Sequence, residues 1–413
     1  MKPSHAFLAI LFMVNAATRA QVVPAATGPT GLPVSGTLHY SLNYSQIAQF
    51  YNGSGGDSQR SAVSGEVTYA NASAARPFAL TYSGGDMWTI SGADEGTGVY
   101  QHLLASLGFL RRSWAFNLSD NVSYMPQAPT TGFSGIPGVG NQPGTPGAPV
   151  QPILTLNTRS VSNQTGANFT HRLDHATSLG ISGGYGILRF PDGNGLETNS
   201  LQTGPQITRR LNALNSISGQ YAFSRISYPA HTSYTMGTQS ALFGYQRKWN
   251  RRFTTSVSAG PEWIEGSESA GIPSSTDLTV NASANYGSKS MSASLGYSQA
   301  ASGGAGVTTE VGAHNQDAYA GLTRQQGKNL SISVTGAYMR TQGLQQTQTG
   351  VTNGMYGGVS AIQRWGRYIV VFANYTATQQ SSNSTLPSNA ISGLSQVIGF
   401  GLGYSPREKR FKK

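Results

Sequence analysis

Residues 278–286 read LTVNASANY and residues 290–298 read SMSASLGYS. In the first stretch Leu278, Val280 and Tyr286 alternate with polar residues, and the second stretch repeats the pattern. A period of two places apolar side chains on one face of a β-strand and polar side chains on the other. Both stretches therefore predict strands that separate an apolar from a polar environment.

This alternation starts near residue 36 and continues almost to the end of the chain, without the 3.6-residue apolar period of helices. Short, mostly basic turns recur about every 38 residues, centred near residues 74, 112, 174, 211, 250, 288, 327 and 366. Longer polar loops are expected near residues 46–59, 85–97, 125–155, 191–197, 228–236, 265–277, 301–311, 343–353 and 380–393. Nine hairpins fit this spacing, which predicts about 18 strands, with 16 as the alternative.

The composition indicates that these strands cross a membrane. Only 10% of the 413 residues are charged, against about 25% in soluble proteins. A soluble solenoid or propeller has a similar repeat but would need a more charged surface. A closed barrel satisfies every backbone hydrogen bond in lipid, with its apolar face outside and its polar face toward water. We therefore predict an all-β fold, a single closed antiparallel transmembrane β-barrel over residues 36–405.

Aromatic residues gather toward both ends of the expected strands. One group adjoins the short turns and comprises Trp114, Trp249, Trp365 and Tyr368; a second group, toward the long loops, includes Tyr124 and Trp263. Amphipathic rings favour the interfaces between membrane and water, so the two groups predict two aromatic belts.

The last expected strand alternates Ile398, Phe400, Leu402 and Tyr404 with small or polar residues. With the strand pattern of the whole barrel, it resembles the bacterial outer-membrane β-barrels of the porin-like class. The resemblance implies that these four residues form the signal read by the barrel-assembly machinery. It also implies short turns in the periplasm and long loops outside. The chain departs from the class in its tail, because the class usually ends on an aromatic residue and this chain ends on Lys412 and Lys413.

The N-terminus indicates export. Residues 1–20 combine a charged start, a short apolar core and small residues before the expected cleavage after Ala20, as in a secretory signal peptide. A retained anchor helix is the alternative. Residues 21–35 are then a periplasmic lead-in, and residues 406–413 are a basic periplasmic tail.

The charges are sorted between the two ends of the barrel. Most basic residues lie at the short turns or in the tail, and most acidic residues lie near the long loops. The predicted periplasmic basic ring comprises Arg111, Arg112, Arg209, Arg210, Lys248, Arg251, Arg252, Arg364 and Arg367. It would bind anionic lipid headgroups or dock an anionic periplasmic partner. No nucleic acid is expected, because scattered turns do not form an interleaved basic and aromatic face.

The polar strand faces predict the lining of the lumen. They consist mostly of Ser, Thr, Asn, Gln and Gly, and the few charges on strands are Glu66, Asp120, Arg189, Arg225, Glu262, Asp317 and Arg340. A barrel of 18 strands is wide enough for an aqueous channel. We therefore expect an outer-membrane, porin-like channel for the passive diffusion of small hydrophilic solutes.

The Pro- and Gly-rich insert at 125–155 carries no charge. By count it is the third long loop, and in porins the third loop folds inward and narrows the pore. The comparison with the porin loop rests on the position of the insert alone. It makes these residues candidates for a constriction: Pro126, Phe133, Pro137, Pro143 and Pro149. An external loop is the equal alternative.

Two other functions stay open. One is an exporter or scaffold barrel, for example for polysaccharide secretion, with a periplasmic partner at the basic ring. The other is a membrane-embedded lipid hydrolase, which would need a lipid-facing Ser–His pair on neighbouring strands and a third group to orient the His. The tightest His/Asp cluster, at residues 171–175, lies in a short turn, and the chain has no cysteine. We therefore expect no enzyme, no metal site and no cofactor, and either a monomer or a homotrimer in contact with outer-membrane lipids.

Overall fold

The structure is a computed structural model, and it describes residues 37–53, 56–71, 73, 75–92, 97–126, 159–193, 196–229, 234–267, 271–302, 312–345, 350–383, 393–406 and 409–410. The strands are β1 (Thr37–Gly53), β2 (Ser58–Asn71), β3 (Phe78–Gly92), β4 (Gly98–Leu110), β5 (Trp114–Met125), β6 (Ser160–Arg172), β7 (Thr177–Arg189), β8 (Thr198–Arg210), β9 (Asn215–Ser227), β10 (Thr235–Lys248), β11 (Phe253–Glu265), β12 (Ser275–Gly287), β13 (Met291–Ser302), β14 (Ala313–Gln326), β15 (Leu330–Gly343), β16 (Val351–Trp365), β17 (Ile369–Ser382), β18 (Gly393–Tyr404) and β19 (Lys409–Arg410). No helix in these ranges is long and apolar enough to cross a membrane.

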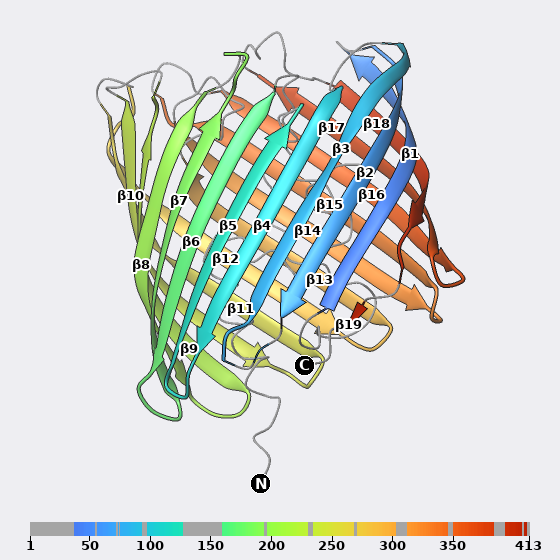
Figure 1. Cartoon of the computed structure of the whole chain (residues 1–413). Coiled ribbons are helices and arrows are strands. Elements are labelled where there is room, and N and C mark those ends of the chain that lie inside the picture. Colours follow the sequence, from blue (N-terminus) through green and yellow to red (C-terminus); the bar gives the residue numbers. More distant parts are fainter. Residues whose placement is uncertain are drawn as a thin grey trace.

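The first eighteen strands form one closed barrel. Each strand pairs antiparallel with the next, and β18 returns to pair with β1 from Leu42 opposite Tyr404 to Gly53 opposite Gly393. Figure 1 shows the strands tilted around the barrel, with the short turns at its lower end. Closure leaves no sheet edge, as a membrane requires. The predicted fold class and the count of 18 strands are confirmed.

The two-residue strand β19 lies in the predicted basic tail. Arg410 pairs with Thr37 and Lys409 with Leu38, so the tail returns to the start of β1.

The short turns lie where the 38-residue spacing predicts them, for example residues 111–113 between β4 and β5 and residues 249–252 between β10 and β11. Two loop predictions near the N-terminus were too wide. Strand β1 runs through residues 46–53, and β3 runs through residues 85–92. Polar residues on the apolar row, such as Gln46 and Asp86, interrupt the sequence pattern there without interrupting the strand.

Apolar side chains cover the outside of the barrel. Leu278, Leu295 and Phe400 are each at least half exposed, and each lies on the same face of its strand as the other large apolar residues. Among the exposed large apolar residues on described strands, Ile362 is the exception that lies on the interior row. The outer face is therefore suited to lipid.

Two Gly-Pro pairs interrupt the ladder on either side of the β9–β10 hairpin. Between β8 and β9 the pairing skips Gly204-Pro205, and between β10 and β11 it skips Gly260-Pro261. Proline has no N–H to donate to a neighbouring strand. A Cβ on Gly260 would collide with the Ala241 carbonyl oxygen, so the backbones approach too closely there for a side chain.

Candidate functional site: the barrel interior

The interior rows of the strands are mainly uncharged and polar. On β12, Thr279, Asn281, Ser283 and Asn285 alternate with the outward row of Leu278, Val280, Ala282, Ala284 and Tyr286. Interior hydroxyls pair across strands: Ser256 and Ser283 lie 2.7 Å apart, and so do Ser123 and Ser162. These groups can exchange hydrogen bonds with water or with a polar solute without presenting a charge.

The strand-borne charges do not all face the lumen, which corrects the expected lining. Glu66, Glu262 and Asp317 lie on interior rows. Four others share the outward row with apolar residues: Asp120, Arg189, Arg225 and Arg340. The spacing carried the signal, since Leu118 and Val122 lie two residues to either side of Asp120. Arg60 on β2, which was not among the expected charges, is buried on the interior row. Away from the strand ends, the interior rows therefore carry fewer charges than the sequence predicted.

The described residues also form four buried apolar clusters that sequence reasoning missed. Buried Ile47, Ala62, Met87 and Tyr100 form one cluster across β1–β4. A second joins Met339 on β15 to Tyr356 on β16. Two more lie toward the long-loop end: Tyr228 with Ile272, and Met236 with Ile264 and Ala301. Most of these residues interrupt otherwise polar rows, while Tyr228 and Ile272 lie in connections and Ala301 lies on the outward row at the end of β13, so alternation alone could not identify the clusters. The interior wall is therefore polar toward the short turns and partly apolar toward the long loops.

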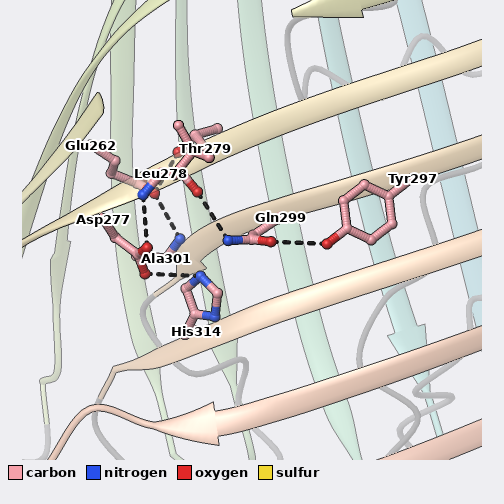
Figure 2. A network of polar contacts seen from close by, with 8 residues as sticks. All are labelled: Glu262, Asp277, Leu278, Thr279, Tyr297, Gln299, Ala301 and His314. Atoms are coloured by element: carbon pink, nitrogen blue, oxygen red, sulfur yellow. Dashed lines mark hydrogen bonds and ion pairs between the residues drawn. The ribbon is translucent and has the colours of Figure 1, made fainter. Parts of the chain in front are cut away.

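A network of polar side chains replaces part of the ladder between β12 and β13. Backbone pairing of these strands begins at Val280 opposite Gln299, although β12 starts at Ser275 and β13 continues to Ser302. In the unpaired segment the Gln299 side-chain amide donates to the Leu278 carbonyl at 3.2 Å. The Ala301 N–H donates to the Glu262 carboxylate at 2.9 Å (Figure 2).

Glu262 is the centre of this network. Its side chain is buried, and Oε2 accepts the Thr279 hydroxyl at 2.6 Å as well as the Ala301 N–H. Next to it, Nε2 of His314 lies 2.9 Å from a carboxylate oxygen of Asp277 (Figure 2). Buried carboxylates are tolerated when they are hydrogen-bonded. The network thus seals the wall at a point where backbone pairing stops.

An ion pair joins two connections at the long-loop end. Arg159, just before β6, donates its Nε to both carboxylate oxygens of Asp192 at 2.9 and 3.0 Å, and its backbone N–H donates to Asp192 at 3.1 Å. Hydrogen bonds from Arg159 hold the pKa of the Asp192 carboxyl below its usual value. Nearby, Arg189 contacts Glu197 at 3.6 Å.

Among the described residues, few groups could serve the lipid-hydrolase alternative or a metal site. Nε2 of His39 on β1 lies 3.1 Å from the hydroxyl of Ser405, which directly follows the neighbouring strand β18. His39 is on the interior row, away from lipid, and no carboxylate hydrogen-bonds it among the described residues. In the turn at 171–175, Asp174 accepts the backbone N–H groups of Ala176 and Thr177, which lowers its pKa and closes the turn. No group of three or more His, Asp or Glu in the described ranges could hold a metal ion.

The predicted surface residues occupy these positions. The basic ring residues lie in the short turns or at the adjoining strand ends. Trp114, Trp365, Trp249 and Tyr368 lie at the same end, and Trp263 and Tyr124 lie toward the other end and face outward. Ile398, Phe400, Leu402 and Tyr404 all face outward on β18, where Tyr404 stacks on Tyr368 with ring centroids 5.9 Å apart. Of the candidate constriction residues, Pro126 is buried directly after β5, and Phe133, Pro137, Pro143 and Pro149 lie outside the described residues.

No protein-family model matches the chain, and no curated protein matches it. Solved structures to which it is similar include Pseudomonas aeruginosa OccK9 (OpdG), with 9% identity, a TM-score of 0.47, and coverage of 90% of this chain and 98% of that one. Acinetobacter baumannii OccAB4 has 10% identity and a TM-score of 0.47, covering 91% of this chain and 98% of its own. Pseudomonas aeruginosa OccK2 (OpdF), solved in complex with glucuronate, has 9% identity and a TM-score of 0.47, covering 90% and 96%.

The class is defined by the barrel of this chain itself. Eighteen antiparallel strands close on themselves, with an apolar exterior and a mainly polar interior. This architecture is that of the porin-like bacterial outer-membrane β-barrels. The chain is a multi-pass β-barrel protein of the outer membrane, and the placement of its short turns in the periplasm stays a prediction.

Proposed function

We propose that the barrel is a channel for the passive diffusion of small, uncharged hydrophilic solutes. The observation that carries this proposal is the interior lining of Ser, Thr, Asn and Gln rows, such as Thr279, Asn281, Ser283 and Asn285 on β12. Neutral hydroxyls and amides replace water around a sugar-like solute, and their hydrogen bonds are weaker than those to charged groups. The proposal includes no catalysis, because the Ser–His pair at Ser405 and His39 faces the interior without a carboxylate among the described contacts.

Liposome swelling tests the proposal directly. Liposomes that contain the refolded chain should swell in isosmotic solutions of small neutral sugars, at rates that fall steeply with solute size and differ little between isomers of one size. Planar-bilayer recordings should show stable open steps with weak ion selectivity. Absence of both swelling and steps from inserted, folded protein would contradict a diffusion channel.

The insert is tested in the same recordings. A variant without residues 127–152 has larger steps if the insert narrows the pore, and unchanged steps if it is an external loop. Either result leaves the channel itself in place. The conductance of this variant therefore decides whether the candidate constriction residues narrow the pore or lie in an external loop.

We also propose that the basic ring binds anionic phospholipid headgroups of the inner leaflet. Exposed Leu211, Trp249 and Tyr368 lie in the turns that carry or adjoin ring arginines, so these turns offer an apolar anchor beside a positive charge. The Arg247 guanidinium lies 4.1 Å from the centroid of the Trp249 ring, at the level expected of an interfacial aromatic. This combination fits a lipid interface better than a soluble periplasmic partner, which remains the alternative.

A further inference from the structure

The outward face of β5 and β6 carries a polar cluster in the middle of the lipid-facing surface. Asp120 lies on the outward row of β5, six residues from Trp114 and four from Tyr124. On the next strand, Asn163 and Thr165 are also on the outward row, opposite Val122 and Asp120. Because Trp114 and Tyr124 mark the two ends of the membrane span, Asp120 lies near its middle.

The cluster is held together by hydrogen bonds to one carboxylate oxygen. Oδ1 of Asp120 accepts the Thr165 hydroxyl at 2.7 Å and the Asn163 amide at 3.1 Å. Neither bond uses the second oxygen, and the Asn163 amide has a second N–H. Within the described chain, the cluster therefore retains both an acceptor and a donor for a group outside it.

Other outward charges lie where water or headgroups can reach them. Asp86 lies opposite Val99, the second residue of β4, at the long-loop end. Arg189, Arg209, Arg225, Arg247, Glu265, Arg324 and Arg340 all lie within the last four residues of their strands. Ionisable groups in the middle of a membrane are costly and usually find a protein partner. Thr165 and Asn163 serve one oxygen of Asp120, and the second oxygen calls for a further partner that lipid does not provide.

Small residues surround the cluster and would let another barrel approach closely. Ala105 lies opposite Asp120 on β4, and Ala167 and Gly183 lie opposite each other on β6 and β7, all on outward rows. In membranes, small residues and polar groups mark the surfaces at which proteins pack against each other. The polar cluster and these small residues, from β4 to β7, are referred to below as the Asp120 face.

We propose that the Asp120 face is a contact surface for a second copy of this chain. A partner must offer a hydrogen-bond donor at the same depth in the membrane, and a copy inserted in the same orientation does so. Asn163 of the same face is one such donor. Contact of Asn163 in one copy with Asp120 in the other, and the reverse, gives a two-fold pair.

The test measures the mass of the full chain by analytical ultracentrifugation in mild detergent and by subunit counting in lipid bilayers. We expect a dimer. The Asp120→Leu variant should stay folded, since leucine suits a lipid-facing position, and should associate about tenfold more weakly or worse. Ala167→Phe should also weaken association by adding bulk to the same face, whereas Ala282→Phe, on the outward row of β12, should not.

Folding of each variant is checked by its heat-dependent gel mobility, so that loss of association is separate from loss of the barrel. A monomeric parent chain would overturn the proposal. An oligomer unaffected by both Asp120→Leu and Ala167→Phe would overturn it as well. Equal weakening by Ala282→Phe would show that the contact is not specific to this face, with the same consequence.

Discussion

Glu262 shows how one side chain can take over from missing strand pairing. Its carboxylate accepts the backbone N–H of Ala301, which has no partner on β12 at that level. A buried N–H without an acceptor is expensive, so the carboxylate contributes more here than an ordinary surface acid would.

Replacement of Glu262 by alanine should lower the free energy of unfolding by about 1–3 kcal/mol, because two buried donors lose their acceptor. Denaturant unfolding of the barrel in lipid or detergent measures the change. Glu262→Gln, which keeps an acceptor oxygen, should lose less. Glu265→Ala, an exposed acid on the outward row of the same strand, should change stability by less than about 0.5 kcal/mol. Equal effects of the two alanine variants would contradict this role of Glu262.

Asp192 makes the stability of the long-loop end depend on pH in a direction that follows from its lowered pKa. Its pKa is lowered by Arg159, so its contribution to stability is present at pH values above the ordinary carboxyl range and is lost as pH falls through the lowered folded value. Below about pH 4, hydrogen exchange at the Arg159 N–H should therefore accelerate beyond its intrinsic pH trend. Asp192→Asn should remove this pH-dependent step. Its persistence in the variant would assign it to another group.

At the scale of elements, the two Gly-Pro pairs set the β9–β10 hairpin apart. Gly204-Pro205 and Gly260-Pro261 interrupt its ladder on either side, whereas the two strands of the hairpin pair with each other without a gap. At both glycines the neighbouring backbone approaches so closely that it leaves no room for a Cβ.

A methyl group at Gly260 should therefore force the neighbouring strands apart. We expect Gly260→Ala to destabilise the barrel by about 1–3 kcal/mol, the usual cost of overpacking. Gly357→Ala is the matched control, because Gly357 also lies within a strand and nothing lies within 4 Å of its added Cβ. That control should be neutral or slightly stabilising. Unfolding midpoints measure both, and a neutral Gly260→Ala would show that the strands can relax there.

The strands and the turns between them were the features of this molecule that the sequence predicted best. The alternation in 278–286 and 290–298 gave the strands, and the repeated turns gave their number, because a residue's face depends only on its parity in the strand. The position of Asp120 could also have been read from Leu118 and Val122 on its row. The interior clusters could not, since the burial of Ile47 or Tyr228 depends on contacts between strands distant in sequence. The Glu262 network likewise depends on where β12 and β13 part.

At the scale of the whole molecule, the basic ring should make stability depend on lipid charge. Substitution of Arg209, Arg210, Arg251 and Arg252 by glutamine should reduce the stabilisation gained from anionic over neutral lipid, by up to about 1 kcal/mol per residue. Unfolding in the two kinds of bilayer measures this, and added salt should shrink the difference in the parent chain. An unchanged lipid dependence, together with lost function in cells, would favour the periplasmic partner.

The pairing of β18 with β1 has a consequence for the order of the chain. Thr37 and Tyr404, where the barrel begins and ends, both lie at the short-turn end of adjacent strands, so the barrel is a ring of hairpins without a structurally distinct first member. A circular permutant that joins β18 to β1 by a linker and opens in another short turn, for instance at 249–252, would keep every strand neighbour. The same closure means that the last strand must be available before the wall is complete, so assembly has to follow synthesis of the full chain.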